Sequence, residues 1–243
     1  MISLDEQTER DFFDKNFSTY ISPIDRIDKY FMDYLLLHIN KKLMILDIGG
    51  GGGQFANSCV KNMPNCKVTI VDPSKKMLDS ANDYNINIIK IQGGLPNKLN
   101  VTETYDTVHI NNVIHHIVDT SPKLSKKKVY ESLLNIKDTM NSDSKLLFGD
   151  IFYDGHIYPP ISKFLIFYLL KIQNILGYKF KDDNFLLGLN VCFYSKYELE
   201  KLINDAGFKI EKTYKYEWKK SYKTALLGIK RYGRIGFILS KMN

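Results

Sequence analysis

Residues 46–53 read Leu-Asp-Ile-Gly-Gly-Gly-Gly-Gly, and this stretch decides the fold class. The apolar residues that end at Ile48 are typical of a buried strand, and a segment with helical spacing follows the glycines. Five consecutive glycines are costly in chain entropy, which indicates a turn whose backbone approaches a ligand closely. Such a turn also directs the N–H groups of a helix N-terminus at the ligand. The stretch therefore predicts a binding turn at the carboxyl end of a strand.

Short apolar runs alternate with helical stretches around this turn. We expect strands at residues 43–48, 67–71, 86–91, 107–111 and 145–151, and helices at 55–62, 75–82 and 126–140. This alternation predicts right-handed crossovers and a parallel α/β sheet. A helix over 195–206, capped by Ser195 and ended by Gly207, then precedes strands at 208–218 and 234–240. No clear helix separates these last strands, which predicts an antiparallel hairpin at the end of the sheet.

The remaining segments suggest a division of the chain. We expect residues 1–40 to form an N-terminal helical cap and residues 41–243 to form the main domain, with an inserted lid at 152–192. The apolar stretch Ile161–Leu176 has 16 residues and contains two lysines, so it is short for a membrane span. We expect it to be the core of the lid, and a membrane contact is the alternative.

Composition excludes several classes of protein. A chain of 243 residues with 44% hydrophobic and 25% charged residues is long enough for one large α/β domain. Its three cysteines are odd in number and form no Cys-x-x-Cys, so we expect no disulfide framework and no metal site. The cysteines and the polar N-terminus, which lacks a secretory layout, favour a cytoplasmic location. The net charge of +7 is concentrated at the C-terminal end, where residues 209–243 hold ten basic and two acidic residues.

Two carboxylates refine the prediction for the glycine turn. Asp72 ends the next strand 19 residues after Gly53, where an acidic side chain can accept both hydroxyls of a ribose. A nicotinamide or flavin cofactor stays open, because Gly51, Gly53 and Ala56 fit the looser dinucleotide pattern. No Lys-Ser/Thr follows the glycines, which excludes a Walker phosphate loop. Asp47 favours a cofactor that carries an ammonium, such as S-adenosylmethionine (SAM), over a pyrophosphate that a carboxylate would repel.

Three motifs occur in order along the chain: Asp47-x-Gly49-x-Gly51-x-Gly53 with Asp72, then residues 105–116, then residues 195–208. Together they resemble class I SAM-dependent methyltransferases, in particular the small-molecule branch called type 11-like. The similarity spans about residues 40–240 apart from the insert. It implies a Rossmann-like sheet of seven strands in the order 3-2-1-4-5-7-6, with the last strand antiparallel and helices on both faces. It also implies S-adenosyl-L-methionine as cofactor.

The resemblance assigns a set of residues to the cofactor. They are Asp47, Gly49, Gly50, Gly51, Gly53, Asp72, Pro73, Ser74, Met77, Gly94, Leu95 and Asn111. One departure concerns the adenine, which an acidic residue after the third strand often meets in this family. Here that segment reads Ile91-Gln92-Gly93-Gly94-Leu95-Pro96. We therefore expect the adenine to be held by the backbone of Leu95, by Gln92, or by shape.

The histidines suggest the chemistry. His115 and His116 follow the fourth strand at the mouth of the expected site, and an imidazole titrates near neutral pH. In similar O-methyltransferases a histidine here is the base, with an aspartate at the end of strand five behind it, the place of Asp150. Adjacent residues point to different sides, so we expect at most one histidine to face the acceptor. His109 lies inside strand four, and we expect it to be a core histidine.

These observations predict methyl transfer to a small-molecule acceptor, such as a hydroxyl of a hydrophobic, aromatic or sugar-bearing metabolite in natural product biosynthesis. The alternative is a nucleic-acid methyltransferase that uses the basic C-terminal hairpin, where Tyr214, Tyr216 and Trp218 could stack bases. Against it, strand four ends in Asn111-Asn112-Val113 rather than Asn/Asp-Pro-Pro-aromatic, so a nucleic-acid partner is disfavoured. A non-catalytic SAM-binding protein and a nicotinamide oxidoreductase stay open. No membrane span is expected, and the sequence does not predict the oligomeric state.

Overall fold

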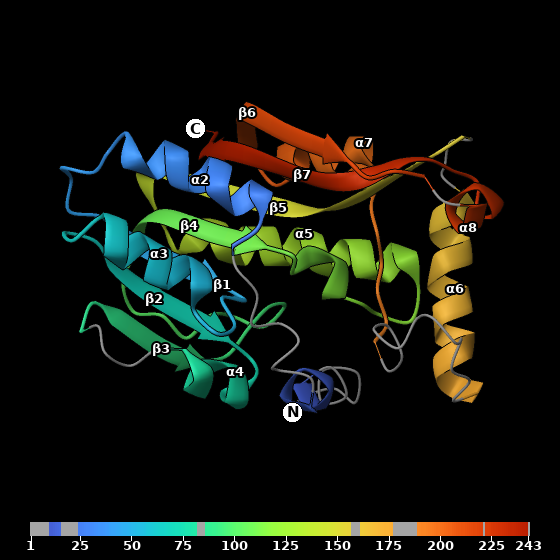
Figure 1. The fold of residues 1–243 in the computed structure, drawn as a ribbon, viewed down its shortest axis with the longest axis horizontal. Coiled ribbons are helices and arrows are strands. Elements are labelled where there is room, and N and C mark those ends of the chain that lie inside the picture. Colours follow the sequence, from blue (N-terminus) through green and yellow to red (C-terminus); the bar gives the residue numbers. More distant parts are fainter. Residues whose placement is uncertain are drawn as a thin grey trace.

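The protein is described by a computed structural model that covers residues 10–15, 24–81, 86–156, 161–176, 189–220 and 222–242. Its strands are β1 (Met44–Ile48), β2 (Lys67–Asp72), β3 (Ile88–Gln92), β4 (Tyr105–Asn111), β5 (Met140–Gly155), β6 (Phe208–Glu217) and β7 (Ile229–Lys241). They form one seven-stranded sheet in the order β3-β2-β1-β4-β5-β7-β6 (Figure 1). The pairs from β3 to β5 are parallel, and β7 is antiparallel to both of its neighbours. The predicted order and antiparallel last strand are confirmed.

Helices cover both faces of the sheet. They are α2 (Arg26–Leu36), α3 (Gln54–Asn62), α4 (Lys75–Ser80), α5 (Pro122–Asp138), α6 (Ile161–Leu176), α7 (Lys196–Asp205) and α8 (Tyr222–Leu226), with a 3₁₀ turn η1 (Ile114–His116). The apolar sides of α2 and α3 pack with one face of the sheet, and those of α5 and α7 pack with the other. The sheet is therefore buried between two cores, which holds the carboxyl ends of β1, β2 and β4 in fixed positions.

A glycine on β7 allows α2 to lie close to the sheet. A Cβ added at Gly236 would lie 2.8 Å from Cγ2 of Ile27 and 3.1 Å from Cζ of Phe31, which are buried residues of α2. Asp25 caps this helix by accepting a hydrogen bond from the backbone N–H of Asp28. The first turn of α2 is thereby placed against the end of the sheet where the cavity described below opens.

The C-terminal part agrees with the sequence in its main features. Ser195 and Glu198 form a complete capping box at the start of α7, and Gly207 follows this helix with φ of 78°. β6 and β7 form the expected antiparallel pair, with the short helix α8 between them. β5 is longer than expected, because it stays paired with β7 as far as Gly155.

The apolar helix α6 lies at one end of the molecule, beside the sheet rather than across it (Figure 1). We expected its apolar residues to form the core of a lid, but most of them are exposed. None of the described helices combines the length and the apolar character that crossing a bilayer requires.

Candidate functional site

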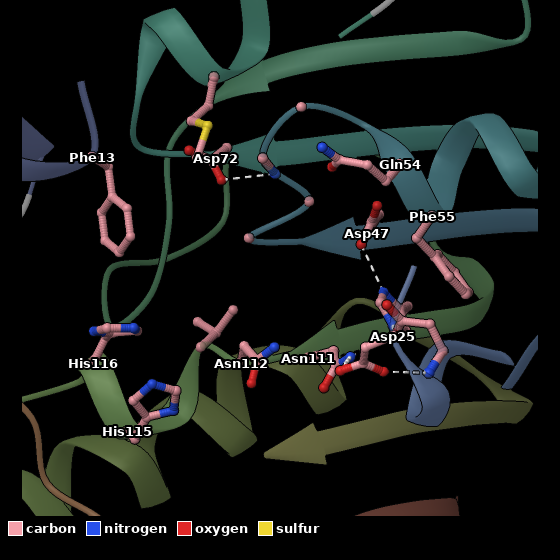
Figure 2. A pocket seen from close by; sticks show the side chains of 18 of the residues that line it. Phe13, Asp25, Asp47, Gln54, Phe55, Asp72, Asn111, Asn112, His115 and His116 are labelled. Carbon is pink, nitrogen blue, oxygen red and sulfur yellow. Dashed lines mark hydrogen bonds and ion pairs between the residues drawn. The ribbon is translucent and has the colours of Figure 1, made fainter. Parts of the chain in front are cut away.

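A cavity of about 460 Å³ opens at the carboxyl ends of the central strands (Figure 2). The glycine turn, Asp25 and Asp28 at the start of α2, and the first two residues of α3 form one side of it, and η1 forms the other. A second cavity of about 300 Å³ adjoins it and shares the walls formed by Gly49, Pro73, Val113 and His116. Both cavities therefore lie where open α/β sheets bind their ligands.

The glycine turn gives the first cavity its floor. Gly49, Gly50, Gly51 and Gly52 line it, whereas Gly53 does not. A Cβ added at Gly50 would lie 2.5 Å from Oδ2 of Asp47, so only glycine lets the turn pass this carboxylate. Gly53 is the N-cap of α3 and has a φ of 74°, a left-handed conformation that favours glycine. A glycine is therefore needed here for the turn from strand to helix.

Asp72 ties the glycine turn to the end of β2. Its Oδ2 accepts a hydrogen bond of 2.9 Å from the N–H of Gly51, and its Oδ1 accepts one of 2.8 Å from the N–H of Ser74. Burial raises the pKa of Asp72 to about 6, although both backbone donors act in the opposite direction. The carboxylate lies in the wall of the first cavity, between the glycine turn and Pro73.

Asp47 is joined to a helix of the N-terminal segment through a histidine. Its Oδ1 lies 2.7 Å from Nδ1 of His109, and Nε2 of that imidazole lies 3.1 Å from Oδ1 of Asp28 on α2. The ring also stacks on Phe55, with centroids 3.7 Å apart. Burial alone would lower the pKa of His109, but Asp47 and Asp28 outweigh it and raise this pKa to about 9. The imidazole is therefore a cation between two carboxylates at neutral pH.

His109 differs from the core histidine that we expected. It is buried, but it lines the cavity and holds charged partners. The other oxygen of Asp47, Oδ2, is buried and has no hydrogen-bond partner within the described part of the chain. This oxygen is the side of the carboxylate that lies against Gly50 at the glycine turn.

The same network continues to β7. Nδ2 of Asn111 donates a 2.6 Å hydrogen bond to Asp28, and Nη2 of Arg234 donates one of 2.6 Å to Oδ1 of Asn111. Arg234 also forms a 2.6 Å ion pair with Oδ2 of Asp25. The sequence analysis missed Asp25, Asp28 and Arg234, because their partners are distant in the sequence. The one local pattern that could have indicated them is an acidic residue at the start of a helix, Asp25, followed by a second one three positions later, Asp28.

His115 lines the opposite wall of the cavity, and its partner Asp150 is buried behind it. Nδ1 of His115 lies 2.5 Å from Oδ1 of Asp150, and its backbone N–H donates a 3.1 Å hydrogen bond to Oδ2 of the same carboxylate. The ring of Phe193 packs against the imidazole at 5.3 Å between centroids. Asp150 therefore fixes the imidazole through Nδ1, and Nε2 is the ring nitrogen outside this pair.

Both adjacent histidines line the first cavity. The reason is local, since η1 is a 3₁₀ turn and not an extended strand, and the two rings lie 4.1 Å apart at 41°. Burial, and then the neighbouring His115, lower the pKa of His116 well below its usual value. Phe13, from the short helix at residues 10–15, packs edge-on against His116 at 5.3 Å.

The other residues assigned from the sequence fall into three groups. Met77 lines the first cavity, Pro73 lines both, and Gly94 and Leu95 line the second. Asn111 lines the first cavity, but its amide is bonded within the network. Ser74 and Asp150 are buried behind the walls, where Ser74 caps α4 through the N–H of Met77. Gln92 and Gly93 border the second cavity beside Gly94, where the sequence placed the adenine.

Comparison with known proteins agrees with this geometry. A family model described as a methyltransferase domain matches residues 46–141. A release factor glutamine methyltransferase of Flavobacterium psychrophilum is 31% identical over 125 residues, which is 46% of this chain and 40% of that protein. The chain thus matches well under half the length of this relative.

Solved structures share the fold over nearly the whole chain. One is the 1,6-didemethyltoxoflavin-N1-methyltransferase of Burkholderia thailandensis, solved with 1,6-didemethyltoxoflavin and S-adenosylhomocysteine. Its TM-score to this chain is 0.59 at 14% identity, and the match covers 98% of this chain and 88% of that one. Another is the magnesium protoporphyrin IX methyltransferase of Synechocystis PCC 6803 with bound SAM, with a TM-score of 0.57, 14% identity, and coverage of 98% and 97%. Residues 46–141 thus match a methyltransferase domain, and the solved structures show that the chain as a whole has the fold of these methyltransferases.

Proposed function

We propose that this chain binds SAM across the two cavities and transfers its methyl group to a hydroxyl of a small, apolar or aromatic acceptor. The observation that carries the proposal is the pairing of two features in one cavity. An unpartnered oxygen of Asp47 lies at the glycine turn, and His115, paired with the buried Asp150, lies in the opposite wall. The first suits a cation of the cofactor, and the second suits removal of a proton from the acceptor.

The charges around Asp47 fit the amino group of SAM. The network holds three carboxylates, those of Asp25, Asp28 and Asp47, and two cations, Arg234 and the protonated His109. One negative charge is left over, beside the buried Oδ2 that lacks a partner. An ammonium would neutralise it, whereas the pyrophosphate of a dinucleotide would be repelled. The site therefore favours SAM over a nicotinamide or flavin cofactor.

The remaining parts of the cofactor have matching walls. Asp72 is already fixed by two backbone donors, and its carboxylate retains lone pairs that would accept the ribose hydroxyls. The second cavity, bordered by Gln92, Gly94 and Leu95, would hold the adenine. Arg10 and Phe13 of the helix at residues 10–15 line these cavities, which supports residues 1–40 as a cap over the cofactor.

Bound SAM supplies a methyl group on a sulfonium, which is already activated for in-line displacement. Nε2 of His115 would accept the proton of the attacking hydroxyl. Asp150, at 2.5 Å from Nδ1, holds the imidazole in one tautomer and stabilises the cation that forms. Ile151, Leu189 and Phe193 give this side of the cavity an apolar wall, which favours a hydrophobic acceptor.

The nucleic-acid alternative loses its main support in the structure. Tyr214 stacks on Tyr30 of α2 with ring centroids 4.6 Å apart, and Arg26 of the same helix lies 5.4 Å from the ring of Tyr216. The protein itself thus occupies one face of each of these two rings, which leaves Trp218 as the exposed aromatic residue in the described part of the hairpin. A small acceptor that enters the cavity is the better match.

Two measurements test the proposal. Calorimetry on the purified chain should show binding of SAM and S-adenosylhomocysteine and no binding of NAD. Release of S-adenosylhomocysteine is then followed over a panel of phenols and other aromatic alcohols. With an accepted substrate, His115→Ala should lower kcat by roughly 10²–10⁴-fold while the Kd for SAM changes little. His116→Ala is the matched control, and an equal loss of kcat in this control would contradict the assignment of the base.

A further inference from the structure

Helix α6 exposes most of its apolar residues. Eight residues form one continuous face of the helix, and all of them are at least 42% exposed: Ile161, Phe164, Leu165, Tyr168, Leu169, Ile172, Ile175 and Leu176. The opposite face is buried and mixed, with Ser162, Lys163 and Gln173 beside Phe167 and Leu170. A helix in a globular domain normally turns its apolar stripe inward. An exposed apolar surface of this kind marks an interaction site.

Polar contacts fix the orientation of this helix. Nζ of Lys163 forms a 2.9 Å ion pair with Glu198, the residue that completes the capping box of α7, and lies 4.3 Å from the ring centroid of Tyr194. At the other end, Nδ2 of Asn174 donates hydrogen bonds to the carbonyl of Leu189 and to Oδ1 of Asn190. Turning the apolar face inward would break the buried pair of Lys163 and Glu198, which is strongly unfavourable. The outward direction of the apolar face is thus built into the fold.

A basic tip lies at the same end of the molecule. The segment between β6 and β7 approaches the end of β5, from which the chain leads to α6. The N–H of His156 donates to the carbonyl of Gly228, and Arg231 pairs with Asp154. Figure 1 shows α8 beside one end of α6. Among the described residues of this tip, the exposed side chains include Trp218, Lys219, Lys220, Leu226, Lys230 and Arg231, next to Glu217, which pairs with Lys215.

We propose that the outer face of α6 and the basic tip dock together on a lipid bilayer that carries anionic headgroups. The sequence of α6 contains no acidic residue, and the cations of the tip complement negatively charged lipids. An apolar helix face flanked by lysines and a tryptophan is the composition of a segment that lies in the plane of a membrane surface. This inference does not depend on the proposed methyl transfer.

The charge beside this face favours a membrane over a second copy of the chain. A second copy would present the same cations, whereas anionic headgroups complement them. A bilayer also accepts a single amphipathic surface.

Sedimentation with vesicles tests the proposal on the full chain. We expect the protein to sediment with vesicles of phosphatidylcholine and phosphatidylglycerol in equal parts, and far less with phosphatidylcholine alone or at high salt. Leu169→Glu should lower the partition coefficient by about tenfold or more, the change that corresponds to one leucine side chain left out of the membrane. Lys219→Glu combined with Lys220→Glu should remove the preference for the anionic lipid.

Leu134→Glu is the matched control, because Leu134 is an exposed leucine of α5 and the substitution changes the charge equally. It should bind vesicles as the wild type does. Three results would overturn the proposal. One is equal vesicle binding by Leu169→Glu and the wild type, and another is no binding to either vesicle. The third is a dimer in analytical ultracentrifugation that Leu169→Glu converts to monomer, since this result would assign the face to a second copy. Thermal melting of each variant checks that it is folded.

Discussion

Nδ1 of His109 lies 2.7 Å from Oδ1 of Asp47, and the two residues occupy paired positions on the neighbouring strands β4 and β1. Because Asp28 binds the other ring nitrogen, this one side chain connects the start of the glycine turn to α2. His109→Leu would leave two buried carboxylates without their cation, and we expect a loss of roughly 3–5 kcal/mol in the free energy of unfolding. Urea denaturation measures it. His38→Leu is the control, since His38 lies on the partly exposed end of the N-terminal helical segment, and a similar loss there would rule out a specific role for His109.

The same histidine predicts how stability depends on pH. Asp47 and Asp28 overcome the effect of burial and raise the pKa of His109 to about 9, against about 6.5 in an unfolded chain. Since the pKa of His109 is raised in the folded state, its stabilising contribution to the free energy of unfolding is complete below about pH 6.5. This contribution is lost as the pH rises through 9. We expect the free energy of unfolding to fall by on the order of 3 kcal/mol across this window. The measurement is urea denaturation at several pH values, and in His109→Gln this slope should disappear.

The close packing of α2 predicts the effect of a single added methyl group. Gly236→Ala places a Cβ against Ile27 and Phe31, so we expect it to cost roughly 1–3 kcal/mol through displacement of α2. Gly93→Ala is the comparison, because its Cβ would make only an ordinary contact of 3.7 Å with Val71. If the denaturation curves of the two variants coincide, α2 has room to move and the prediction is contradicted.

Asp72 predicts a second pH dependence, this time of cofactor binding. Burial raises its pKa to about 6, so the carboxylate loses its charge as the pH falls through this value. Under the proposed function the Kd for SAM should rise below about pH 6, because a protonated carboxyl accepts hydrogen bonds poorly. Calorimetry across this range gives the Kd, and Asp72→Asn should bind weakly at every pH. Undiminished affinity of Asp72→Asn for SAM would contradict the assignment of Asp72 to the ribose.

Features that depend on neighbouring residues could be predicted from the sequence. The strand before Gly49, the glycine turn and Asp72 at the next strand end all form local patterns, and the resemblance then supplied the strand order. The pairing of His115 with Asp150 was also anticipated, because the resemblance implied it. His115 follows β4, and Asp150 lies on the adjacent parallel strand β5.

Features that depend on distant partners could not be predicted. His109 looked like a core residue because its partner Asp28 is 81 positions away. That both histidines of η1 line one cavity could not be predicted either, because it follows from the 3₁₀ turn that holds them. The apolar residues of α6 suggested burial, but Lys163 and its partner Glu198, 35 positions later, hold the other face inward. Composition alone does not reveal such anchors.

The network that ends at Arg234 has a consequence for how this protein can be divided. The segment that matches the methyltransferase family, residues 46–141, contains Asp47 and His109 but neither Asp28 before it nor Asp150 and Arg234 after it. Exchanging only that segment with a related protein would transplant the glycine turn and leave its counter-charges behind. A chimaera that keeps its buried charges paired has to carry α2, the end of β5 and β7 along with the matched segment.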